Sequence, residues 1–139
     1  MNKLRLSGIL CLAATAALEL LPWGAVCNFA AENGEYLRET YSYFDPLPFG
    51  YANFGPLITA LLSSVLLTLW VCGAVFESEG GYFQLMSALS AAAALTSLLP
   101  LTLGMRFYSP IGAAISLLLI ASLVLSLILA KLNDRENRE

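Results

Sequence analysis

One carboxylate stands in an otherwise apolar stretch near the start of the chain, and it is the residue best placed to do chemistry. Glu19 is surrounded by alanines and leucines. An ionisable group at membrane depth costs about 2.5–3.5 kcal/mol at a helix centre, which marks it as a functional candidate. Gly8, Cys11 and Thr15 precede it at spacings of three and four, so a helix would place all four on one face. That stripe is either a packing seam between helices or one wall of a polar pathway that ends at Glu19.

A buried carboxylate needs either a partner or a proton. Arg38 and Arg106 are the only basic residues in the two outer connections, and long basic side chains can reach down into a membrane from its rim. We expect Arg106 to be the better partner, because a short connection would hold it at the rim of the helices. An ion pair would make Glu19 a structural clasp. Without a partner, Glu19 would be neutral in its buried state, as a proton carrier requires during part of its cycle.

The usual ingredients of an enzyme are missing from this sequence. It contains no histidine, which removes the commonest general base and metal ligand. Cys11, Cys27 and Cys72 have no metal-binding spacing, and no basic patch suggests nucleic acid. We therefore expect no catalytic residue, no metal, no cofactor and no nucleic-acid partner.

The composition indicates a membrane protein. Of 139 residues, 58% are hydrophobic and only 12% are charged, against roughly a quarter charged in ordinary soluble domains. Four windows reach the roughly 20 apolar residues that a membrane-spanning helix needs, at residues 4–26, 56–76, 82–103 and 109–130. The sequence thus predicts an all-α protein of one domain, a bundle of four transmembrane helices.

The distribution of lysine and arginine predicts how the chain crosses the membrane. The basic residues gather at the two ends of the chain, in residues 3–5 and in a tail at residues 131–139, which places both termini in the cytoplasm. We expect a multi-pass protein of the plasma membrane. Lys3 and Arg5 before an apolar run also suggest a secretory signal peptide, but the unbroken leucine-rich context around Glu19 favours an uncleaved helix.

Small and weakly polar residues should mark the faces on which membrane helices pack. Each of the later windows has such a stripe. The predicted stripes are Ala60, Ser64, Thr68 and Cys72; Ser87, Ala91, Ala94 and Ser97; and Gly112 with Ser116.

The outer loop, residues 27–55, is rich in aromatic side chains. Asn33-Gly34 can adopt the positive φ values of a tight turn, so the flanking segments could pair as a short β-hairpin. Rings beside a membrane commonly settle at the headgroup level and anchor helix ends; the alternative is a loop that binds a partner. Because the rings can bury against one another and the bundle, we expect an ordered loop. Eight of the loop residues are aromatic, among them Phe29 and Tyr36. The candidate contact residues are the other six: Tyr41, Tyr43, Phe44, Phe49, Tyr51 and Phe54.

Three resemblances bear on function. Residues 19–30, with Tyr43-Phe44-Asp45 and residues 48–56, resemble a group of small bacterial four-helix membrane proteins; the likeness covers most of the chain and implies no activity. The topology is similar to that of claudins. Their outer loop contains a pair of cysteines, however, whereas Cys27 is the only cysteine in the outer loop of this sequence. Glu19 resembles the carboxylate with which small multidrug resistance transporters exchange protons for cations, but those proteins have short connections and a carboxylate nearer the helix centre.

The sequence therefore favours a non-enzymatic membrane scaffold or accessory subunit that acts through contacts of its helices and outer loop. Its expected partners are the lipid bilayer and either a second copy or another membrane protein. The alternative is an oligomeric proton-coupled transporter of small molecules that uses Glu19.

Overall fold

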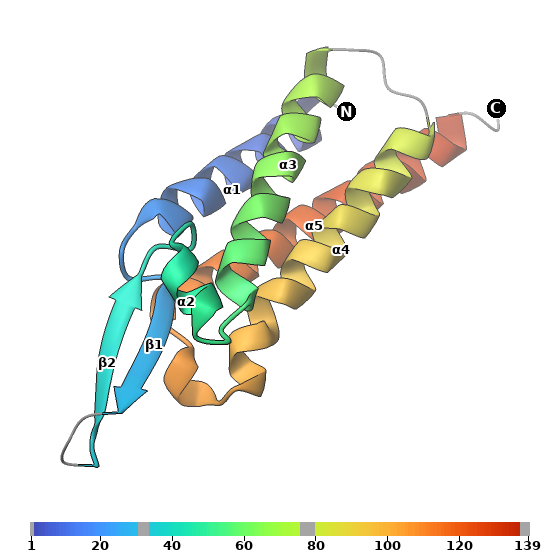
Figure 1. Ribbon diagram of the computed structural model, residues 1–139. Helices are drawn as coiled ribbons and strands as arrows, with labels where there is room; N and C mark the ends of the chain where they lie inside the picture. The colour runs from blue at the N-terminus through green and yellow to red at the C-terminus, as the bar shows by residue number, and fades with distance from the viewer. Residues whose placement is uncertain (1, 31–33, 76–79, 137–139) are drawn as a thin grey trace.

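Four long helices account for most of the chain in the computed structural model, which describes residues 2–30, 34–75 and 80–136 (Figure 1). The long helices are α1 (Asn2–Leu20), α3 (Gly55–Val75), α4 (Gly80–Thr102) and α5 (Pro110–Glu136). Shorter elements connect them: strands β1 (Ala25–Ala30) and β2 (Tyr36–Tyr41), helix α2 (Pro46–Gly50) and the 3-10 turn η1 (Met105–Phe107).

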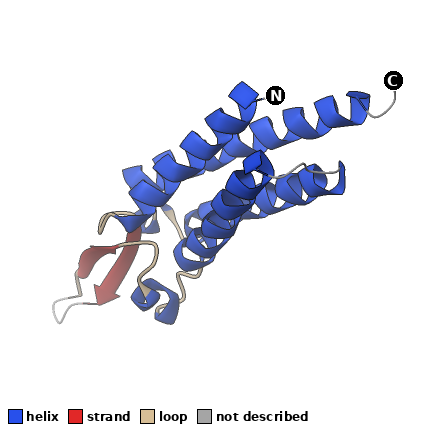
Figure 2. Ribbon diagram, turned by 90° about the horizontal axis from the view of Figure 1, so that it is seen from above, coloured by secondary structure: helices blue, strands red, loops and turns tan. Residues whose placement is uncertain are grey.

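The long helices pack as a ring in which α1 and α4 each contact both α3 and α5. Figures 1 and 2 show them running alongside one another, with the N and C labels at one end and the strands at the other. The hairpin, α2 and η1 together form a cap at that second end, which we call the outer cap because it contains most of the predicted outer loop.

Within the described residues, three helices are long and apolar enough to cross a membrane: α3, residues 81–102 of α4, and residues 110–135 of α5. This confirms the predicted predominance of helix and the apolar character of the last three windows. α1 does not meet the same criterion, because Lys3, Arg5 and Glu19 all lie within its 19 residues.

The predicted end of the first helix, at residue 26, is wrong. α1 ends at Leu20, and Val26 lies in a strand. Pro22 cannot donate the backbone hydrogen bond that a continuing helix needs. Gly24 allows the chain to pass beside Tyr43, since a Cβ at residue 24 would lie 2.8 Å from that ring. The last turn of α1 is instead completed from the cap, where the Tyr43 backbone N–H donates to the Glu19 carbonyl at 2.9 Å.

The predicted hairpin is present. β1 and β2 are antiparallel, with Ala25 opposite Tyr41 and Ala30 opposite Tyr36. Gly34 has φ +76°, as the turn prediction required. The paired strands leave a connection of residues 31–35, longer than the tight turn expected at Asn33-Gly34; residues 31–33 lie outside the described residues.

The base of the hairpin is anchored to the helices by buried hydrogen bonds. The Asn53 amide donates to the Val26 carbonyl at 3.0 Å, and the Ser109 hydroxyl donates to the Gly24 carbonyl at 2.5 Å. These links join Val26 in β1 and Gly24 just before it to residues that shortly precede α3 and α5. The described part of the outer loop is therefore attached to the helices at the start of the hairpin.

The predicted packing stripe is buried in the last helix and, except for the partly buried Cys11, in the first. It is shifted in the second helix, and in the third only Ala94 and Ser97 of its four residues are buried. Thr15, Glu19, Gly112 and Ser116 are all buried. In α3, however, the expected Thr68 is exposed. The buried face of α3 consists instead of Gly55, Pro56, Thr59, Ala60, Ser63, Leu66, Trp70 and Gly73.

Helix α5 is longer than predicted. It continues from Pro110 to Glu136, whereas the sequence suggested a helix that ends at residue 130 followed by a tail. Residues 131–136 of the expected tail thus extend the same helix, and residues 137–139 lie outside the described residues.

Candidate functional site

Glu19 lies in the last turn of α1 and is completely buried. Its partner is Ser63 of α3, whose hydroxyl oxygen is 2.6 Å from Glu19 Oε2. The other carboxyl oxygen, Oε1, is buried and has no hydrogen-bond partner among the described residues. Since α3 starts at Gly55, Ser63 lies about 12 Å along that helix at 1.5 Å per residue. The carboxyl group is therefore well inside the apolar length of α3.

The distances around the Ser63 hydroxyl bear on whether the Glu19 carboxyl group carries a proton. Its hydroxyl oxygen lies 2.6 Å from Glu19 Oε2 and 3.0 Å from the Ala60 carbonyl oxygen. A hydroxyl has one proton to donate, and a carbonyl can only accept. Both contacts are full hydrogen bonds when Glu19 is protonated, donates to Ser63, and Ser63 donates to Ala60. The arrangement therefore suits a neutral carboxylic acid.

The structure does not bring the candidate arginines to Glu19. The Arg106 guanidinium lies over the Tyr36 ring, 5.7 Å from its centroid, and Arg38 donates to the Tyr108 carbonyl at 3.5 Å. Both arginines are exposed on the outer cap. Glu19 is instead hydrogen-bonded to Ser63 of α3, one position before the Ser64 of the predicted stripe. The four-residue spacing of the polar residues Thr59 and Ser63 was the signal in the sequence that could have predicted this face of α3.

The six candidate aromatic residues of the outer loop divide into two groups. Tyr43 is buried at 1% exposure, and Tyr41 and Phe44 pack against the core beside it. The remaining three are exposed at the surface, at 40% for Phe49, 62% for Tyr51 and 46% for Phe54.

Each of these exposed rings packs against another aromatic ring. Phe49 and Phe54 meet edge to face with centroids 4.9 Å apart, and Tyr51 meets Phe29 of β1 at the same distance. Helix α2, which carries Phe49, is capped by Asp45, whose carboxylate accepts from the Leu47 backbone N–H at 2.8 Å. The outer cap thus presents an ordered aromatic surface.

Two titratable groups of the hairpin have a raised pKa. The Tyr41 hydroxyl donates to Glu39 Oε2 at 2.5 Å, and this hydrogen bond raises the pKa of Tyr41 to about 12. Burial, with the negative charges of Asp45 and Glu39, raises the pKa of the Cys27 thiol. A thiol with a raised pKa is a poor nucleophile, so Cys27 is a packing residue of β1.

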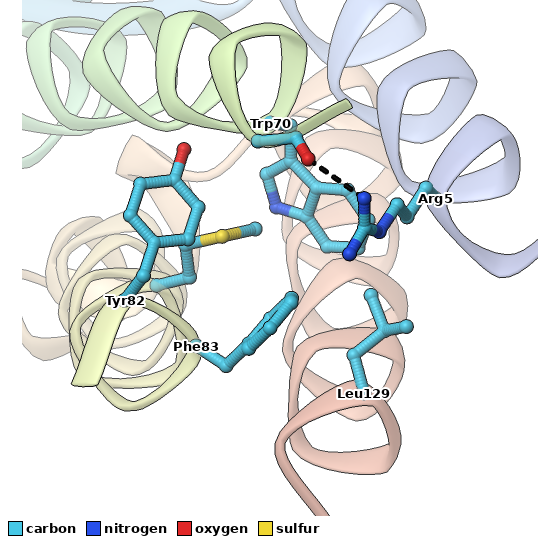
Figure 3. Close-up of a pocket in the computed structure, with 7 residues that line it drawn as sticks. Arg5, Trp70, Tyr82, Phe83 and Leu129 are labelled. Atoms are coloured by element: carbon cyan, nitrogen blue, oxygen red, sulfur yellow. Dashed lines mark hydrogen bonds between the residues drawn. The ribbon is translucent and has the colours of Figure 1, made fainter. Parts of the chain in front are cut away.

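A second polar cluster lies at the opposite end, around Arg5, which the sequence did not single out as a site residue. Its Nη1 donates to the Gly73 carbonyl near the end of α3 at 2.8 Å, the bond dashed in Figure 3. The guanidinium also lies 5.5 Å from the Phe83 ring centroid. Arg5 Nε and Trp70 Nε1 are buried without a hydrogen-bond partner in the described part of the chain.

The cavity between these side chains measures about 10 Å³, room for about one water molecule. No organic ligand fits it as it stands. The Arg5 cluster is therefore a packed junction of all four long helices, because Leu129 of α5 also lines it. The Arg5 guanidinium donates to a carbonyl near the end of α3, where a positive charge is favourable.

No group of three or more histidine, cysteine, aspartate or glutamate side chains that could hold a metal ion occurs among the described residues. The described cysteines are free thiols. The chain matches no known family model, no curated protein and no solved structure. The resemblance to small bacterial four-helix membrane proteins therefore stays a prediction.

Proposed function

We propose that this protein is a non-enzymatic multi-pass membrane protein that acts as a scaffold or accessory subunit through its outer cap. α3, α4 and α5 contain no charged residue from Gly55 to Val75, Gly81 to Thr102 and Pro110 to Ala130. In this proposal α1 is a fourth membrane span. Its basic residues lie in its first two turns, and its one carboxyl group is hydrogen-bonded to Ser63.

One observation carries the proposal: the hairpin is hydrogen-bonded to the helices at its start, while aromatic rings on the outer cap are exposed. Asn53 and Ser109 hold the hairpin to the helices, while Tyr36 and Tyr51 are 65% and 62% exposed. A surface that is already ordered loses little conformational entropy when a partner binds it. Aromatic side chains are also enriched at the centres of protein interfaces.

Photo-crosslinking in intact cells tests the outer cap as a contact surface. A photoreactive phenylalanine analogue replaces Tyr51 or, as the control, Leu61, which is 57% exposed on the apolar length of α3. We expect a discrete protein adduct from residue 51 and only lipid adducts from residue 61. An adduct with the same chain supports a scaffold, and one with another protein supports an accessory subunit. Protein adducts from residue 61 alone would contradict the proposal.

The proposed topology places both termini in the cytoplasm and the outer cap outside. A cysteine at Gly34, on the hairpin, should react with a membrane-impermeant maleimide in intact cells. A cysteine at Asp134, near the end of α5, should react only after permeabilisation. Both positions are exposed and Cys27 is buried, and the partly buried Cys11 and Cys72 are replaced by serine in both proteins to lower the background. The reverse pattern would overturn the orientation.

A second function, proton-coupled transport, is favoured by one specific observation. Glu19 is paired with a hydroxyl rather than an arginine, and one of its oxygens has no partner among the described residues. Proton release driven by ethidium, a lipophilic cation, should be measured in liposomes that contain the wild-type protein or the Glu19→Gln variant. Transport predicts a proton flux in the wild type that Glu19→Gln abolishes. Equal fluxes in both proteins would remove Glu19 from any transport role.

A further inference from the structure

Helix α5 is too long to end inside a membrane. Its 27 residues extend about 40 Å at 1.5 Å per residue, whereas the hydrocarbon core of a bilayer is about 30 Å thick. Lys131 is the first charged residue of the helix after Pro110. The final two turns of α5 therefore continue as helix beyond the apolar length, to the level of the lipid headgroups.

A groove occurs at this level. It is lined by Ile128, Lys131, Leu132 and Arg135, and its volume is about 210 Å³. Spacings of three, four and seven place all four side chains on one face of α5. Two cations thus alternate with two aliphatic side chains, and no described carboxylate lines the groove. This end also carries the N-terminus of α1, away from the outer cap (Figure 1).

We propose that this groove binds the phosphate headgroup of an anionic membrane lipid. Lys131 and Arg135 would contact the phosphate oxygens, Arg135 by a bidentate pair of hydrogen bonds. Ile128 and Leu132 would lie along the first methylenes of an acyl chain. A zwitterionic lipid carries a compensating ammonium group, so the two cations favour lipids with net negative charge. The inference does not depend on what the outer cap binds.

Native mass spectrometry of the purified full chain, with phosphatidylglycerol or phosphatidylethanolamine added in detergent, tests this site. We expect the wild-type protein to retain phosphatidylglycerol in preference to phosphatidylethanolamine. A basic residue near an anionic lipid surface contributes on the order of fivefold to affinity, so Lys131→Gln with Arg135→Gln should lower the preference by about 25-fold. The matched control, Arg38→Gln with Arg106→Gln, removes the same charge from exposed positions on the outer cap, at the opposite end, and should keep the preference.

A charge-preserving variant and a competition with inorganic phosphate complete the test. The exchange Lys131→Arg with Arg135→Lys keeps both charges and should keep most of the preference; its loss would contradict attraction to a phosphate. Inorganic phosphate at millimolar concentration should not displace the lipid, and displacement would show a site for a soluble anion instead. An unchanged preference in the double glutamine variant, or an equal loss in the control, would refute the groove as a lipid site.

Discussion

The hydrogen bond between Glu19 and Ser63 should couple α1 to α3 energetically. Ser63→Ala leaves a buried carboxyl group without its described partner, which costs about 1–3 kcal/mol. Glu19→Ala leaves Ser63 with an acceptor in its own helix, the Ala60 carbonyl. Once Glu19 is absent, Ser63→Ala should therefore cost less. We expect a coupling free energy of about 1 kcal/mol if Glu19 is neutral, and about 1.5–3 kcal/mol if it is ionised.

Unfolding of the purified protein in mixed micelles, by titration with sodium dodecyl sulfate, measures these free energies. Ser64→Ala is the matched control, because its hydroxyl donates to the same Ala60 carbonyl from the next position of α3. The Glu19–Ser64 cycle should be additive within about 0.5 kcal/mol, as should the cycle with Arg106→Gln. Glu19→Gln, which retains a neutral hydrogen-bonding group, should cost less than Glu19→Ala. An additive Glu19–Ser63 pair, or an equal coupling to Ser64, would refute the pairing.

Two other predictions test the packing of α1 and the electrostatics of the hairpin. Gly8→Ala should destabilise the protein by about 1–3 kcal/mol in the same unfolding assay, because its Cβ would lie 2.1 Å from the Trp70 ring; Gly81→Ala, where no atom lies within 4 Å, should not, and equal effects would contradict this contact. In a spectroscopic pH titration, the phenol of Tyr41 should ionise near pH 12, and Glu39→Gln should return its pKa toward about 10. Because the folded-state pKa is raised, the stabilisation from this hydrogen bond is present below about pH 10 and is lost as the pH rises toward 12; identical titrations of the two proteins would contradict this coupling.

Much of the helical architecture was predictable because it follows from local properties of the chain. Long uncharged runs predicted α3, α4 and α5, and an Asn-Gly pair predicted the position of a hairpin. The end of α1 was not predictable from hydrophobicity, since residues 20–26 are as apolar as a helix requires. The chain leaves the helix there because Pro22 interrupts the backbone ladder, and because Gly24 lies against Tyr43, which is distant in sequence.

The sequence by itself determined which residues of α1 share a face, because a helix of known period places Gly8, Thr15 and Glu19 in line. It could not determine which residue of α3 meets that face. Ser63 and Ser64 both recur at helical spacing with earlier residues, and they point about 100° apart around the axis at 3.6 residues per turn. Tertiary packing decided in favour of Ser63, because Gly8 leaves room for the Trp70 ring and thereby helps to set the rotation of α3 about its own axis.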